Sequence, residues 1–215
     1  MGVRNYGQFC SLARALDLVG DRWTLLILRD LLAGPRRFKD LLEGLPGIGT
    51  NLLAKRLKTL ENNGLLQLER LSPQLAVKAY RLTPAGRELE PALVALARWG
   101  IRFLKHPRGE DLWRPQWNHL ALKARFNSLK AHGLNEVYAF RIDDYPYFIR
   151  INSGRLESGE GTPPEAAFSL KTTAAHFMAV FIENTLELDQ ALAGGHFELQ
   201  GSSRAFNRCL TLFQA

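Results

Sequence analysis

The 215-residue sequence has only two cysteines, Cys10 and Cys209, and they lie near opposite ends of the chain. Because there is no CxxC pair and no histidine cluster at ligand spacing, the sequence indicates neither a disulfide framework nor a metal site. It also lacks an apolar run of membrane-spanning length, and its N-terminus carries no signal-peptide core. We therefore expect a cytoplasmic protein that does not enter a membrane.

Motifs of catalysis and cofactor binding are missing as well. The chain has no Ser-His-Asp order, no phosphate-binding loop, no GxGxxG fingerprint and no HExxH motif. The adjacent carboxylates Asp143 and Asp144 fall in a predicted hairpin turn, where solvated carboxylates are expected. We predict that the protein is not an enzyme and uses no cofactor.

What the sequence does have is an uneven distribution of charge. The formal net charge is +7. Residues 1–104 contain 16 Lys and Arg against 9 Asp and Glu, whereas residues 105–215 contain 12 of each class. A basic module joined to a neutral one suggests that the first binds a polyanion and that the second meets a different partner.

The clearest motif is a cationic helix predicted over about 50–62, which we call the reader helix. Leucines recur at helical spacing on one of its faces, and the opposite face is polar and basic. The leucines are Leu53, Leu57 and Leu60, and the polar face carries Asn51, Lys55 and Lys58. A cationic helix that leads into a strand is how a winged helix reaches the DNA major groove. An ordinary surface helix with a solvated basic face is the alternative.

The segments around the reader helix predict a winged helix-turn-helix domain over residues 1–104. Helices are expected over 9–19, 21–32, 38–43 and 84–103, and strands over 65–70 and 78–82 with 71–77 as their connecting loop. Asp21 and Thr83 are candidate N-caps of the second and last helices. A single chain has little core left to cover the first and last helices, so we expect a homodimer.

These residues resemble a known family. The segments LDLVGDRWTLLILRDL (16–31), GPRRFKDL (34–41), LPGI (45–48) and YRLTPAG (80–86) are similar to the HxlR family of bacterial transcriptional regulators. The resemblance covers roughly residues 6–103 and implies a homodimeric winged-helix protein that binds double-stranded DNA. The chain departs from the family pattern at Gly49, where Ser or Thr is usual, and in the wing, where the proline-rich tip is missing.

Contacts to DNA divide into base readout and phosphate binding. Thr50 and Asn51, at the head of the reader helix, are candidates for base edges, with Lys55 next along that face. The phosphate candidates are Arg36, Arg37, Lys39, Lys58 and Lys78. Arg56 has two interpretations, a DNA contact or a structural ion pair with Asp40 or Glu61.

Cys10 lies where some proteins of the HxlR type carry a redox-sensing cysteine. Its sequence neighbours are mostly apolar and do not mark a reactive thiolate. A cysteine packed in the fold or in a dimer interface is therefore the favoured interpretation, and redox sensing is the alternative.

Residues 110–215 predict an α+β domain with a mostly antiparallel sheet, after a linker over 105–109. A helix is expected over 113–131, strands over 136–142, 147–152, 154–160, 166–171 and 196–200, and helices over 173–181, 187–192 and 205–213. This order resembles sterol-carrier-protein-like domains, which implies a cavity for a small apolar ligand. The aromatic residues that could line it, or simply form the core, are Phe168, Phe177, Phe181, Phe197 and Phe206.

Two hypotheses of function follow. The first is a dimeric DNA-binding regulator whose second domain senses a small apolar ligand. The second is a hydrophobic-ligand carrier or interaction protein that uses its winged helix mainly for dimerisation. The positive charge of residues 1–104 favours the first, because a module that only dimerises gains nothing from it.

Overall fold

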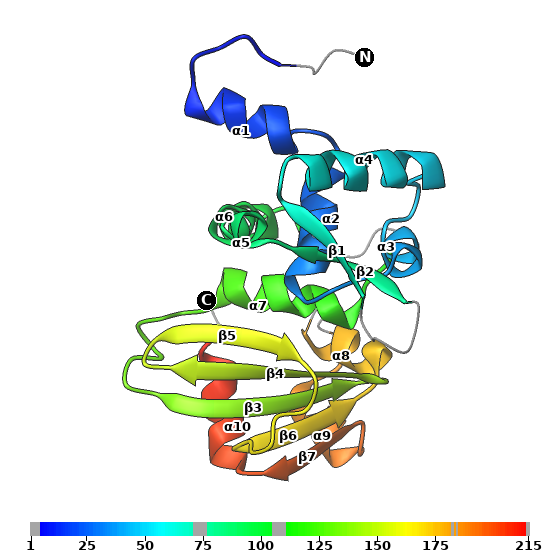
Figure 1. Cartoon of the computed structure of the whole chain (residues 1–215). Coiled ribbons are helices and arrows are strands. Elements are labelled where there is room, and N and C mark those ends of the chain that lie inside the picture. Colours follow the sequence, from blue (N-terminus) through cyan, green and yellow to red (C-terminus); the bar gives the residue numbers. More distant parts are fainter. Residues whose placement is uncertain (1–4, 71–76, 105–110, 182, 184, 214–215) are drawn as a thin grey trace. The chain divides into compact units, whose positions relative to one another are not determined.

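Four helices begin the described part of the chain, and the third and fourth form a helix-turn-helix (Figure 1). The computed structural model describes residues 5–70, 77–104, 111–181, 183 and 185–213. The four helices are α1 (Ser11–Val19), α2 (Thr24–Leu32), α3 (Phe38–Gly44) and α4 (Thr50–Asn62). The reader helix predicted from the sequence is α4.

The first core is built around α2. Ile27, Leu28 and Leu31 recur at helical spacing on one face of α2, and all three are fully buried. The prediction that Asp21 caps this helix was wrong, because α2 begins at Thr24 and no side chain caps it. The Asp21 carboxylate instead accepts a hydrogen bond from Arg56.

A two-stranded hairpin follows α4 and forms the wing. Strand β1 (Leu66–Arg70) pairs antiparallel with β2 (Lys78–Leu82), as the alternating pattern predicts. Of the expected connecting loop, residues 71–76 lie outside the described residues. Arg36 and Tyr80 exchange two backbone hydrogen bonds of 3.0 and 2.8 Å, so the segment before α3 is held against β2.

The single long helix expected over 84–103 is instead two helices, α5 (Pro84–Arg87) and α6 (Glu90–Ile101). Thr83 caps α5, since its Oγ1 accepts from the backbone N–H of Gly86 at 3.1 Å. Gly86 lies so close to the wing that a Cβ atom there would be 2.2 Å from the Leu65 carbonyl oxygen. The helix then narrows to a 3-10 turn, because the N–H of Leu89 bonds to the carbonyl of Gly86 rather than to that of the residue four positions earlier.

The chain divides into two compact units, Met1–Leu93 and Val94–Ala215, with the boundary inside α6. The linker predicted over 105–109 lies outside the described residues. The assignment of DNA binding to 1–104 and of ligand binding to 110–215 stays a prediction. No helix in the described parts of either unit is long and apolar enough to cross a membrane.

The second unit contains a five-stranded sheet in the order β5-β4-β3-β6-β7. Its strands are β3 (Asn135–Ile142), β4 (Tyr145–Asn152), β5 (Arg155–Glu160), β6 (Phe168–Thr172) and β7 (Phe197–Gly201). The expectation of a mostly antiparallel sheet is corrected to a mixed sheet, because the central strands β3 and β6 are parallel. The chain crosses from β5 to the far side of β3 through residues 161–167, a step that local patterns do not encode.

Helices α8 (Ala174–Phe181), α9 (Leu188–Ala193) and α10 (Ser203–Thr211) also belong to the second unit (Figure 1). Each contributes buried residues to the core that lies on one face of the sheet, among them Val180, Ala191 and Phe206. Alternate strand residues such as Tyr138 and Ile149 fill the same core. The sheet and these helices therefore form two layers that pack against each other through a shared core.

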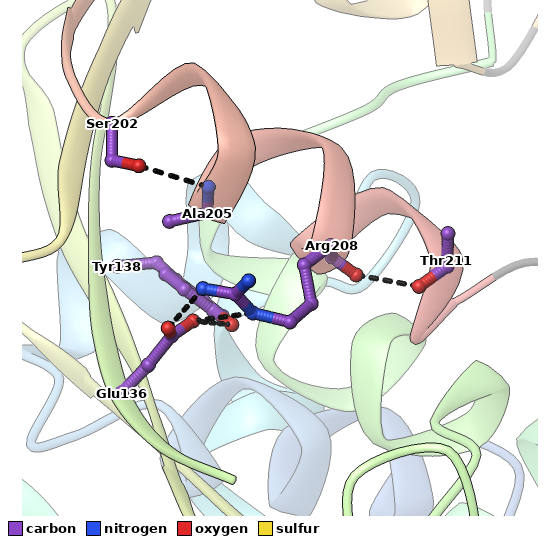
Figure 2. Close-up of polar contacts among 6 residues, drawn as sticks. All are labelled: Glu136, Tyr138, Ser202, Ala205, Arg208 and Thr211. Carbon is purple, nitrogen blue, oxygen red and sulfur yellow. Dashed lines mark hydrogen bonds and ion pairs between the residues drawn. The ribbon is translucent and has the colours of Figure 1, made fainter.

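An ion pair joins α10 to β3 within this unit (Figure 2). The Arg208 guanidinium donates two hydrogen bonds to the Glu136 carboxylate, one of them from Nε at 3.2 Å. The hydroxyl of Tyr138 donates to the same carboxylate at 2.7 Å. Burial, and then this hydrogen bond, raise the pKa of Tyr138, so the phenol stays neutral and acts as a donor.

The helix expected over 113–131 is much shorter than predicted. A 3-10 turn η1 (Pro115–Trp117) leads into α7 (Asn118–Arg125), and Phe126 then adopts an extended backbone that ends the helix. The side chain of Asn127 accepts from the N–H groups of Leu129 and Lys130, both at 3.1 Å. This local competition for backbone donors explains the early end of the helix.

Candidate nucleic-acid interface

The exposed face of α4 carries four of the nine predicted DNA contacts. Thr50, Asn51, Lys55 and Lys58 are exposed, whereas Leu53, Leu57 and Leu60 on the opposite face are buried. Gly49 has an extended backbone ahead of the helix, and no side chain of the described residues caps it. The first turn therefore presents backbone N–H groups beside Thr50 and Asn51, which is an arrangement that attracts phosphate.

The basic residues before and within α3 have different surroundings. Arg37 and Lys39 are exposed, and Lys39 lies 3.6 Å from Glu43 one helical turn later. Asp40 forms a local contact, because its carboxylate accepts a hydrogen bond from the backbone N–H of Arg37 at 3.0 Å. Arg36 is half-buried and its Nη1 donates to the Pro35 carbonyl at 3.2 Å, so it is a weaker phosphate candidate than its neighbours.

The two remaining lysines lie at the end of α4 and in the wing. Lys58 pairs with Glu61 at 3.0 Å, and both side chains keep contact with solvent. Such exposed pairs are weak and exchange readily for other partners. Lys78 is exposed at the start of β2, opposite Arg70 in the hairpin register. Both lysines are therefore accessible to a polyanion.

Arg56 does not make either of the ion pairs expected from the sequence. Its partner is Asp21, in the turn between α1 and α2, rather than Asp40 or Glu61. Only 20% of the Arg56 side chain is exposed. The sequence showed that Arg56 borders the apolar face of α4, but it gave no signal for a partner 35 residues earlier.

The two cysteines lie in contrasting environments. Cys10 is exposed immediately before α1, so it is not packed within its own chain. Cys209 is buried in the core of the second unit, and this burial raises the pKa of its thiol. Redox sensing by Cys10 stays a prediction.

The five phenylalanines proposed as ligand contacts belong to the core of the second unit. Phe168, Phe197 and Phe206 are buried, and Phe177 and Phe181 pack against them partly buried. Their rings contact one another, for example Phe168 with Phe206 at 5.3 Å and Phe177 with Phe181 at 4.9 Å between centroids. A shallow groove lies elsewhere, lined by residues 135–137, 150–152 and 165–167. Ligand binding by these phenylalanines stays a prediction.

Known proteins are similar to the chain over its first half. The sequence profile of the HxlR-like helix-turn-helix family matches residues 18–108. The HTH-type transcriptional regulator YodB of Bacillus subtilis is 39% identical over 90 residues, which are 41% of this chain and 80% of YodB. The chain belongs to the HxlR-like helix-turn-helix family. The solved structure of reduced YodB is 34% identical with a TM-score of 0.40, and the match covers 45% of this chain and 95% of that one.

A second relative is similar over a smaller share of its length. An uncharacterized HTH-type transcriptional regulator of Mycobacterium tuberculosis is 46% identical over 102 residues. The match covers 47% of this chain, and the chain spans 64% of the length of that relative. The family and these relatives are transcriptional regulators and not enzymes, which agrees with the prediction of a protein without catalytic activity. The winged helix-turn-helix predicted from the sequence is confirmed as well.

Proposed function

We propose that the protein is a homodimeric transcriptional regulator that binds double-stranded DNA through α4. The observation that carries the proposal is that this helix has one buried apolar face and one exposed polar face. Three leucines fix it to the core, and the polar face with Asn51 and Lys55 is left exposed. A helix held in this way presents its polar side chains at a fixed orientation to the major groove.

The charges around α4 support the same proposal. Four exposed cations lie in the first unit, Arg37 just before α3, Lys39 on α3, Lys58 on α4 and Lys78 at the start of β2. In this proposal they bind phosphates, while Thr50, Asn51 and Lys55 contact base edges. Cationic side chains that replace condensed counterions make binding depend steeply on salt.

Binding to the DNA that adjoins its own gene, measured by fluorescence anisotropy from low to high salt, tests the proposal. We expect the Lys58→Ala variant to lower the slope of log affinity against log salt by about 0.9, because one phosphate contact is lost. The Asn51→Ala variant should keep the slope and lose discrimination between operator and unrelated duplex by about tenfold. The exposed Arg155 of the second unit provides the matched control, and Arg155→Ala should change neither quantity. Affinity that does not vary with salt would contradict DNA binding.

For the second unit we propose a sensor of a small apolar ligand. Its support is the neutral charge of residues 105–215 and an aromatic row on α8, where Phe177 stacks on Trp113 with 5.4 Å between ring centroids. Phe177 and Phe181 are only partly buried, so a ligand could reach them. Native mass spectrometry of the purified protein should detect a bound small molecule, and Phe177→Ala should release it. A spectrum of bare protein under gentle ionisation would count against sensing.

A further inference from the structure

Asp21 joins two parts of the first unit that are distant in sequence. It lies in the turn between α1 and α2, and its carboxylate accepts a hydrogen bond from Nη1 of Arg56 in the second turn of α4. Arg56 is directed into the protein, since its Nε is buried and has no hydrogen-bond partner among the described residues. A guanidinium in this position has little surface left for a DNA phosphate.

The same turn makes a second contact with the approach to α4. The ring of Trp23 lies beside Gly47, where an added Cβ atom would be 3.8 Å from Cη2 of the indole. Gly47 is two residues before Gly49, the N-cap of α4. The turn after α1 therefore touches both the segment that leads into α4 and the body of that helix.

Helix α1 ends at this turn and carries apolar side chains in contact with solvent. Leu12 is 65% exposed, and Leu16 and Leu18 are also exposed. Under the proposed function these residues meet a second subunit. A dimer binds two half-sites only when its two reader helices are held at the matching separation and tilt.

We propose that Asp21 and Arg56 are positioning residues that hold α4 to the turn after α1. The pair thereby sets the separation of the two reader helices in the dimer. This inference rests on the proposed function, because it requires a dimer that binds duplex DNA. Arg56 then acts through the orientation of α4, and not by touching the nucleic acid.

Two variants separate this role from a direct phosphate contact. Asp21→Asn makes the protein more positive by one charge, so electrostatic attraction alone predicts equal or tighter binding. The positioning role predicts the opposite, a loss of about tenfold in affinity for the DNA segment that the wild-type protein protects. Without the ion pair, α4 is no longer held in the orientation in which its side chains contact the DNA. Arg56→Gln should weaken binding to a similar extent with an unchanged salt slope, whereas loss of a phosphate contact lowers that slope by about 0.9.

The experiment compares binding to duplexes made from the DNA segment that the wild-type protein protects, with base pairs inserted between the half-sites. The wild-type protein should prefer one spacing, and both single variants should lose that preference. The double variant Asp21→Arg with Arg56→Asp keeps the net charge and should restore most of the affinity and the preference. Circular dichroism and native mass measurements establish that each variant is a folded dimer, and the double variant decides the question if a single variant does not fold.

Glu61 supplies the matched control on the same helix. Glu61→Gln removes the carboxylate partner of Lys58 and changes the charge as Asp21→Asn does. It should weaken neither affinity nor spacing preference. Wild-type affinity in Asp21→Asn, or a reduced salt slope in Arg56→Gln, would overturn the inference. Failure of the wild-type protein to bind duplex DNA would overturn the proposed function first and this inference with it.

Discussion

Glu136 is the residue on which the polar contacts of the second unit converge. Its carboxylate accepts hydrogen bonds from Arg208 and Tyr138, and only 19% of its side chain is exposed. Removing the negative charge leaves a half-buried guanidinium without its ion-pair partner. We expect Glu136→Gln to lower the free energy of unfolding by about 2 kcal/mol, measured by urea denaturation.

The exposed pair of Arg150 and Glu157 is the control for this prediction. Glu157 is 66% exposed and lies 3.7 Å from Arg150 on the neighbouring strand. Glu157→Gln should cost less than about 0.5 kcal/mol, because solvent screens such a pair. Equal losses in the two variants would show that burial does not strengthen the Glu136 contact.

At the residue scale, the sequence predicts exposure better than it predicts partners. The exposed positions of Thr50, Asn51 and Lys55 follow from periodicity within one short helix, which is a local property. The partners of Arg56 and Arg208 lie 35 and 72 residues away. The sequence shows that both residues are basic, but only the folded chain determines which carboxylate each one contacts.

At the scale of elements, the contact between α5 and the wing depends on Gly86. A Cβ atom on this residue would meet the Leu65 carbonyl oxygen at 2.2 Å and carbon Cδ2 of Leu82 at 3.1 Å. Gly86→Ala should therefore push α5 away from the hairpin and lower the free energy of unfolding by about 2–3 kcal/mol, measured by thermal and urea denaturation.

Gly49 is the matched glycine at another helix start. A Cβ atom there has no neighbour within 4 Å, and its backbone is one that any residue adopts. Gly49→Ala should cost only about 0.5–1 kcal/mol, as expected for an N-cap change from Gly to Ala. A similar loss at both positions would argue against the close approach of α5 to the wing.

The sequence largely predicts which segments form helices and strands. It does not predict where a helix is interrupted or which strands pair. The strands β1 and β2 lie within one residue of the alternating pattern, and α4 ends where Asn62 was expected. The break between α5 and α6 was missed because the apolar spacing continues through it. The parallel pairing of β3 with β6 was missed because it depends on a crossover between distant segments.

At the scale of the whole molecule, two exposed apolar side chains allow the proposed dimer to be tested. Leu12 on α1 and Trp99 on α6 are 65% and 55% exposed. Replacing Leu12 with Glu places a charge in the proposed dimer interface, and its desolvation opposes association. We expect Leu12→Glu to convert the dimer to a monomer at micromolar concentration, measured by analytical ultracentrifugation.

Leu129 allows a control with the same chemistry. It is 86% exposed in a turn of the second unit, outside the faces proposed for dimerisation. Leu129→Glu should leave the sedimentation coefficient unchanged. A monomeric wild-type protein, or a dimer that survives Leu12→Glu, would contradict assembly through α1.

The distance in sequence between Glu136 and Arg208 has a consequence for biosynthesis. The wing closes through one hairpin, so its backbone pairing is complete soon after Leu82 leaves the ribosome. The second unit cannot complete its sheet or its ion pair until β7 and α10 have been synthesised. Because pairing between distant segments slows folding, we expect the nascent chain to carry a finished winged helix while its second half is still incomplete.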